Sequence, residues 1–486
     1  MNKKIQLTAL LIMMFSSMSW GQLLDLKSAI HRAHELSPEY QINLNRFQSS
    51  YWRYQNYKAT LLPQVGLSAT IPSYTNSSTL ITNDQGEDIF VYQNQSNSDL
   101  RLSVNQNIGF TGGNLSLNSE IDRIDVFGDD RSTNYQVVPF SINYFQGSIF
   151  YNQFKWDKKI QPLYLEEGRR DFVEKMEDIS ITTTAMYFNL LRNQISLKIA
   201  ENNYQNQDTL LKISQGRYEM GKLAENELLQ MELSLLNSKN SVTNLKISVK
   251  RSQQNLARFL QLEEEDLNLN IPEMRSFFHV DQERALEEAS ENRKSVIEFR
   301  RRRLEAEKEL ARVNGTNRLS LNLRANFGVS QQGENLDNIL GDLNKQQSVS
   351  LQVSIPVFDW GVSKSQRKMA KANLDLVNTN LDQEQQQFEQ EITVHTMNWA
   401  NQQDLLVVAQ KAQEVALKRY KITKNRYIQG KITITDLNLA QQEKDQAIIS
   451  YLSALEKYYS DYYTLRRLTL YDFKENKKIE PIDIVF

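Results

Sequence analysis

The sequence predicts a mainly α-helical protein with a smaller β part, built from two structural repeats of strand, strand and long helical hairpin. Three observations predict this fold class. Residues 146–262 match residues 355–471 without a gap at an offset of 209, alternating segments occur in pairs in both halves, and each half holds a helical stretch of about 65 residues. Repetition on this scale indicates two copies of one unit, so the function depends on what two copies build together.

The duplication fixes the expected division of the chain. Within the longer match, Asn189 pairs with Asn398 and Leu228 with Leu437, and a second block, 29–71, matches 285–327 at an offset of 256. We therefore expect a first repeat, a linker, a second repeat and a charged, loose tail. The first repeat is expected at 22–262, the linker at 263–280, the second repeat at 281–471 and the tail at 472–486.

Residues 1–21 have the zones of a secretory signal peptide. Lys3 and Lys4 precede an apolar stretch, and the small residues Ser19 and Gly21 bracket a cleavage site before Gln22. An N-terminal helix of the mature fold is the alternative, but the order of the zones favours processing. Downstream, no run approaches the roughly 18 apolar residues of a membrane-spanning helix.

Composition excludes several classes of protein. The chain has a net charge of −2, four histidines and no cysteine. The balanced charge argues against a nucleic-acid binder, and the absence of cysteine rules out disulfides and thiolate metal sites. His31 and His34 have metal-ligand spacing but no third ligand nearby, and no catalytic motif is present. We expect neither an enzyme nor a cofactor.

Four segments alternate between apolar and polar residues, which is the pattern of a strand. They lie near 63–72, 137–147, 318–330 and 347–357. Strands of this length cross a bilayer, although a soluble sheet with one wet face has the same pattern. We expect the further hairpin near 99–126 to be an external extension of the sheet, and residues 73–98, rich in Ser, Asn and Thr, to be an exposed loop.

Two stretches, 152–218 and 361–427, predict helices of roughly 100 Å, far longer than globular helices and typical of a coiled coil or a tube. Each ends at a glycine turn, Gly221-Lys222 or Gly430-Lys431, after which a second helix returns. The hairpins therefore cover 152–262 and 361–470. Tyr458, Tyr459, Tyr462 and Tyr463 are expected to pack between the helices.

In lipid, four strands alone leave unpaired edges that cost several kcal/mol per group, so a membrane location requires oligomerisation. The signal peptide, the duplicated order of elements, the two Arg-Tyr-x-x-Gly-Lys turns and the strand-to-helix segment Ile-Pro-Val-Phe-Asp-Trp-Gly at 355–361 resemble the TolC-like outer-membrane efflux protein family. The likeness covers residues 23–471.

The resemblance implies a homotrimer with a 12-stranded outer-membrane barrel, continued by an α-helical tunnel in the periplasm. It implies a passive exit duct for substrates that an inner-membrane pump, of the resistance-nodulation-division (RND) or ABC type, delivers through a periplasmic adaptor, or membrane fusion protein. The alternative is a secreted coiled-coil stalk or adhesin with a soluble sheet head.

The resemblance also implies a gate at the hairpin ends. By this resemblance, Asp436 would contribute to a ring of three carboxylates that selects cations. Glu227 paired with Tyr427 would act as a latch that holds the gate closed. An acidic residue in a first helical turn also complements the helix dipole by roughly 0.3–1 kcal/mol, and that reading stays open for Asp436. Ile432 and Leu439 stand where relatives can carry an arginine and a second acid, so one acidic ring at most is expected.

Two further sets of residues follow from the resemblance and from position in the chain. The turns would contact the adaptor through Gly221, Lys222, Gly430 and Lys431. Aromatic residues where strand passes into helix suit a girdle at the periplasmic membrane face, although core packing explains them equally well. They are Phe150, Tyr151, Trp156, Phe358 and Trp360.

Overall fold

The computed structural model describes residues 23–128, 131–263, 267–273, 277–317, 319–336 and 340–480. The expected signal peptide at 1–21 and the last six residues of the tail lie outside these ranges. The described chain divides into two compact units. The sheet unit comprises Ser49–Glu167 and Ile297–Glu384, and the helical unit takes residues 23–48, 168–296 and 385–480.

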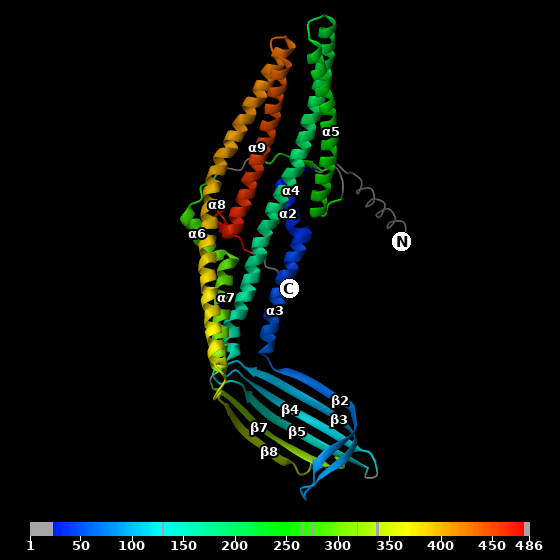
Figure 1. Ribbon diagram of the computed structural model, residues 1–486, viewed down its shortest axis with the longest axis vertical. Helices are drawn as coiled ribbons and strands as arrows, with labels where there is room; N and C mark the ends of the chain where they lie inside the picture. Colours follow the sequence, from blue (N-terminus) through cyan, green and yellow to red (C-terminus); the bar gives the residue numbers. More distant parts are fainter. Residues whose placement is uncertain are drawn as a thin grey trace, which may run out of the picture. The chain divides into compact units, whose positions relative to one another are not determined.

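The sheet unit is built on one antiparallel sheet of six strands (Figure 1). Its order is β2-β3-β4-β5-β7-β8, so each strand lies beside its neighbour in the chain. The bounds are β2 Gln64–Thr82, β3 Asp88–Ile108, β4 Gly113–Val126, β5 Ser132–Gln146, β7 Ser320–Gly333 and β8 Asn344–Ser354.

Cross-strand register keeps the two faces of the sheet distinct. Leu67 lies opposite Leu102 and Leu100 opposite Ile121, while the intervening Ser68 lies opposite Arg101. Side chains alternate with a period of two, so this register collects the apolar residues on one face. The alternation in the sequence therefore determines which face each side chain occupies.

Two strand predictions are wrong. The hairpin near 99–126 is not an external extension, because β3 and β4 lie inside the sheet between β2 and β5. Residues 73–98 are not a loop, because β2 continues to Thr82 and β3 begins at Asp88. Ladder hydrogen bonds use backbone groups, so a run of Ser, Asn and Thr pairs as well as an apolar run. The segments predicted near 63–72, 137–147, 318–330 and 347–357 correspond to β2, β5, β7 and β8.

The helices of the two halves have matching lengths. The short pairs α2 (Leu26–Leu36) with α6 (Gln282–Asn292), and α3 (Pro38–Thr60) with α7 (Lys294–Thr316), have 11 and 23 residues. The predicted long helices are confirmed as α4 (Gln153–Glu219) and α8 (Val362–Ile428), with 67 residues each. They are followed by α5 (Glu225–Phe259) and α9 (Ile434–Thr469).

Length alone does not make these helices membrane spans. Among the described residues, no helix combines the length and the apolar composition needed to cross a membrane.

The core of the helical unit is aromatic. The ring of Trp399 on α8 lies 5.1 Å from that of Tyr458 on α9 and 4.9 Å from that of Phe278 in the linker. Its indole Nε1 donates a hydrogen bond to the Phe278 carbonyl oxygen. Tyr458, Tyr459, Tyr462 and Tyr463 are all buried, as predicted. Large rings that also find polar partners fix the helices at a defined distance and rotation.

The tail is anchored as far as the structure describes it, so the prediction of a loose tail is wrong for residues 472–480. β9 (Tyr471–Asp472) pairs with β10 (Lys477–Lys478). Buried Asp472 accepts a 2.7 Å hydrogen bond from Arg466, which also pairs with buried Glu177 on α4 at 2.7 Å. The guanidinium links both carboxylates, and removing it would leave two uncompensated buried charges.

The linker is also tied to the helices. β1 (Leu23–Leu24) pairs in parallel with β6 (Asn268–Leu269), and the Tyr187 hydroxyl on α4 donates to the carbonyl oxygens of Leu24 and Asn270. These contacts fix the start of the chain and the linker to the same long helix.

Candidate functional site

The two glycine turns end α4 and α8 in the same geometry. Gly221 and Gly430 have φ angles of +69° and +72°, a region that L side chains rarely adopt. In each turn the glycine N–H bonds to the carbonyl three residues back and the lysine N–H to the carbonyl five residues back, at 2.8–3.0 Å. This is the Schellman motif, and it needs glycine at the left-handed position. The side chains of Lys222 and Lys431 are exposed beside the turns.

The ends of the two hairpins are held together. Arg217 donates a 2.8 Å hydrogen bond to the Ile428 carbonyl oxygen and lies over the ring of Tyr427. Tyr427 is only 4% exposed, and its hydroxyl lies 3.4 Å from Ser214 Oγ. Leu210, Met231, Ile434 and Leu437 pack around it. The sequence could not show this contact, because it joins residues 213 positions apart.

Asp436 lies in the first turn of α9 and belongs to a capping box with Thr433. The Thr433 hydroxyl accepts from the Asp436 N–H at 3.3 Å, and the Asp436 carboxylate accepts from the Thr433 N–H at 3.2 Å and from its hydroxyl at 2.8 Å. The carboxylate remains exposed to solvent. Asp436 therefore has a structural role as the partner of Thr433 in capping α9. Its exposed carboxylate is also accessible to ions.

Glu227 occupies the matching first turn of α5, without the matching cap. The N-cap is Ala224, which makes no side-chain cap hydrogen bond. Among the described residues, no hydrogen bond joins Glu227 to Tyr427. The latch between these two residues stays a prediction.

The aromatic residues at the strand-to-helix junctions differ in exposure. Trp360 and Phe358 are 89% and 72% exposed, with their rings in an edge-to-face arrangement at 4.6 Å. Phe150 is 55% exposed, whereas Tyr151 and Trp156 are partly buried. Core packing within the chain therefore does not explain Phe358 and Trp360, and a girdle at the membrane face stays a prediction for the set.

The histidines of α2 are not placed for metal binding. His34 Nε2 lies 2.9 Å from the Met176 carbonyl oxygen and 2.9 Å from Ser180 Oγ, and burial lowers the pKa of His34 to about 4. His31 pairs with Glu35 on the helix surface. In the part of the chain that the structure describes, no group of three or more His, Asp or Glu side chains could hold a metal ion.

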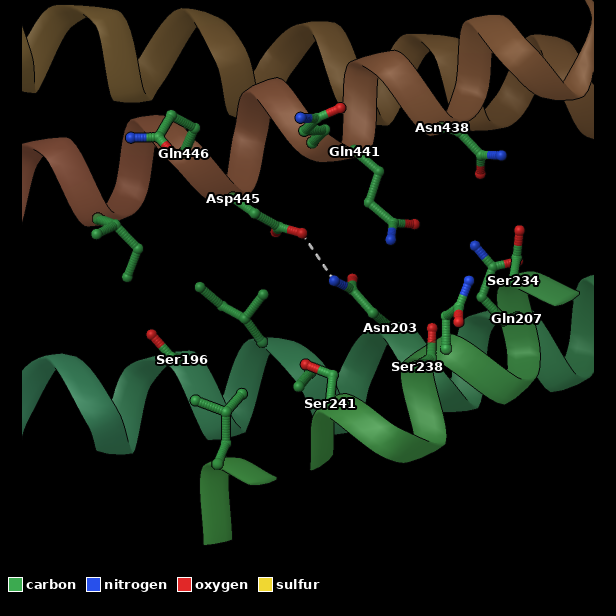
Figure 2. Close-up of a pocket in the computed structure, with 16 residues that line it drawn as sticks. Ser196, Asn203, Gln207, Ser234, Ser238, Ser241, Asn438, Gln441, Asp445 and Gln446 are labelled. Atoms are coloured by element: carbon green, nitrogen blue, oxygen red, sulfur yellow. Dashed lines mark hydrogen bonds between the residues drawn. The ribbon is translucent and has the colours of Figure 1, made fainter. Parts of the chain in front are cut away.

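A polar groove, which the sequence reasoning missed, lies between α4, α5 and α9 (Figure 2). Its volume is about 470 Å³, and serines, asparagines and glutamines dominate its lining. Asn203 donates a 2.7 Å hydrogen bond to Asp445 across it. Gln207 is 2% exposed and its Oε1 makes no hydrogen bond within the described residues. Polar residues at buried heptad positions were the signal that could have revealed this groove.

Comparison with known proteins finds a similarity to one family over part of the chain. Residues 285–469 match the family model described as outer membrane efflux protein. In this part the chain is similar to that family, and the match ends short of the first repeat. A search among curated proteins found no match.

Solved structures of outer-membrane channels share the fold of this chain. The outer-membrane channel OprN superposes with a TM-score of 0.65 at 15% identity, over 91% of this chain and 89% of OprN. The CmeC outer membrane channel of Campylobacter jejuni superposes with a TM-score of 0.64 at 16% identity, over 91% of this chain and 85% of CmeC. The outer membrane protein VceC of Vibrio cholerae superposes with a TM-score of 0.64 at 14% identity, over 94% of this chain and 97% of VceC. At these identities the likeness is one of fold.

Several predictions are thereby confirmed at family level. The resemblance to outer membrane efflux proteins holds over residues 285–469, and the solved structures with a similar fold include outer-membrane channels. The mainly helical fold with an antiparallel sheet matches those channels. The stalk or adhesin alternative finds no support.

Proposed function

We propose that three copies of this chain form the outer-membrane channel of a tripartite efflux or secretion system. In this assembly the sheets close a barrel in the outer membrane and the helices form a tunnel in the periplasm. The channel is a passive exit duct, and an inner-membrane RND or ABC transporter delivers substrates to it through a periplasmic adaptor. The observation that carries the proposal is that each chain exposes two different helical seams, which further copies of the chain would cover.

The first seam runs along α5. Its members are spaced alternately by four and three residues, and all are exposed: Leu229, Leu233, Leu236, Asn240, Thr243 and Ile247. The second seam runs along α8 with the same alternation, and all its members are exposed: Leu405, Val408, Ala412, Val415, Arg419 and Ile422. Both seams lie in the helical unit. This 3-4 spacing is that of the a and d positions of a coiled coil.

Two unlike seams on one chain favour a ring. When seam α5 of one copy packs on seam α8 of the next, the contact is heterologous, and such contacts close into a ring when the rotation fits. The sheet supports the same assembly, because its two outermost strands, β2 and β8, each have an edge with no partner among the described residues. Open edges are not tolerated in lipid, so neighbouring copies must pair them.

The faces of the sheet suit a channel wall. Exposed apolar residues gather on one face, including Val65, Leu67 and Val349 at 71%, 69% and 77% exposure. The other face carries small polar residues such as Ser68, Ser141 and Ser350. An apolar face toward lipid and a polar face toward a water-filled lumen is the pattern of membrane barrels. The exposed Phe358 and Trp360 suit the girdle of such a barrel.

The hairpin ends are the proposed gate. In a ring of three copies, three Asp436 carboxylates would lie at one level and favour cations. Tyr427 with Glu227 would hold the closed state, and Gly221, Lys222, Gly430 and Lys431 would contact the adaptor. The Arg217 contact to Ile428 supports the gate by joining the two hairpins of one chain at this end.

Single-channel recording in planar bilayers tests this function. We expect the wild-type protein to conduct with a preference for cations, and Asp436→Asn to lower that preference because it removes one charge per copy. Thr433→Ala is the matched control, because it breaks the same capping box without changing charge. If Asp436→Asn keeps the wild-type cation preference, the assigned ring is wrong, and a protein that forms no channel contradicts the function itself.

A further inference from the structure

We propose that the β3–β4 hairpin is part of the channel wall, so that the closed ring has eighteen strands and not the twelve that two strands per repeat would give. The inference rests on the proposed channel function and specifies its barrel. Three copies with six strands each supply the eighteen.

The first argument is the continuity of the sheet. β3 pairs with β2 from Gln64 to Thr82, with one irregularity near Thr70, and β4 pairs with β3 over its whole length. β4 in turn pairs with β5 from Asn114 to Val126. A hairpin attached outside the wall would leave β2 paired with β5, and these two strands are not neighbours.

The second argument is the position of the hairpin's turn. Asn107 donates a 2.8 Å hydrogen bond to the Thr60 carbonyl oxygen at the end of α3, and Gln106 donates to that of Leu61. Asn152, which precedes α4, donates to the carbonyl oxygens of Gly109 and Phe110 in the turn. All of these residues lie in the sheet unit. The hairpin therefore reaches the end of the sheet at which the helices begin, and an extension beyond the opposite end would not.

The third argument is that the hairpin carries the same two faces as its neighbours. Leu100, Leu102 and Val104 on β3 lie opposite Ile121, Ser119 and Leu117 on β4. On the other face Ser103 lies opposite Gly66 on β2 and Asn118 on β4, and Arg101 pairs with Glu120. Across β2, β3 and β4 one face is therefore mainly apolar, with Ser119 as an exception, and the other is polar. A wall between lipid and water requires two such faces.

A wall of eighteen strands changes the dimensions of the exit. The diameter of a barrel grows roughly linearly with strand number, so spacing and tilt give about 36 Å between backbones for eighteen strands against about 24 Å for twelve. Six is an even number, so β8 of one copy meets β2 of the next in antiparallel orientation. The inserted hairpin thus widens the outer mouth without altering the alternation of strand direction.

Cysteine substitution tests the inference directly, because the chain has no cysteine of its own. Ser103→Cys places a thiol on the polar face of β3, and Leu102→Cys places one on the apolar face one residue away. Ser350→Cys on the polar face of β8 is the reference for a lumen position that does not depend on the hairpin. Each variant in proteoliposomes is treated with a charged, membrane-impermeant thiol reagent, and labelling is followed by mass spectrometry.

We expect Ser103→Cys to react at the same rate as Ser350→Cys. Leu102→Cys should react at a rate at least roughly 50-fold lower, because lipid excludes a charged reagent. Labelling of Ser103→Cys should also lower the single-channel conductance. If Ser350→Cys is labelled but Ser103→Cys and Leu102→Cys react at equal rates, the hairpin is not part of the channel wall. Failure of Ser350→Cys to react would instead contradict the proposed channel and with it the eighteen-stranded wall.

Discussion

At the scale of single residues, buried His34 couples folding of the helical unit to pH. Its Nε2 donates to the Met176 carbonyl oxygen, and burial lowers its pKa to about 4. In the unfolded chain the pKa of a histidine is about 6.5. Between these two values the unfolded chain binds the proton and the folded chain does not, so stability falls as the pH falls from about 6.5 towards 4.

This coupling predicts a measurable loss of stability in acid. Between pH 7 and pH 5 we expect His34 to contribute about 2 kcal/mol of destabilisation. Chemical unfolding followed by helical circular dichroism, for the wild type and for His34→Gln, measures the contribution. Glutamine retains an N–H donor but does not titrate, so the variant should lose less stability over this interval. Equal pH dependence in both proteins would contradict the assignment to His34.

The site residues show how far sequence reasoning reaches at this scale. Gly221 and Gly430 were predicted as turns because only glycine adopts the left-handed conformation without strain. The two readings of Asp436 could not be separated, because its partner Thr433 is visible as a cap only once α9 is known to begin at Ile434. The burial of Tyr427 could not be predicted, because it depends on the pairing of two distant hairpins.

At the scale of elements, two glycines five residues apart in the first hairpin should respond oppositely to alanine. Gly221 has a φ of +69°, so Gly221→Ala forces a Cβ into the left-handed region at a cost of about 1–2 kcal/mol. Gly216 lies inside α4 with no neighbouring atom within 4 Å of an added Cβ. Gly216→Ala should stabilise the helix by about 0.5–1 kcal/mol.

Amide hydrogen exchange of residues 214–224, followed by mass spectrometry, tests this pair of predictions. We expect faster exchange in Gly221→Ala and slower exchange in Gly216→Ala. A change in the same direction for both variants would mean that the turn does not have the Schellman geometry in solution.

Helices and strands were not equally predictable. The long helices were predicted well, because an unbroken period and two glycine turns determine α4 and α8 locally. Strands near 63–72 and 137–147 were also recognised, but the place of β3 and β4 was not. An alternating pattern fixes the two faces of a strand and says nothing of its neighbours in the sheet. The anchoring of the tail through Asp472 was missed for a similar reason, since its partners lie on α4 and α9.

At the scale of the whole molecule, the proposed assembly follows from the surfaces that the single chain leaves uncovered. It exposes mainly apolar seams on α5 and α8, and β2 and β8 each have an edge without a partner among the described residues. Each seam is a regular 3-4 pattern of the kind that buries itself in a coiled coil. Under the proposed function, the seam on α5 of one copy would pack on the seam on α8 of the next, and such head-to-tail contacts would close the copies into a ring.

Electron cryomicroscopy of the full-length protein purified from outer membranes tests this claim most directly. The account predicts three copies around one water-filled lumen, with α5 of each copy against α8 of the next and eighteen strands in the closed sheet. A stable, folded monomer with exposed seams and no enclosed lumen would contradict it.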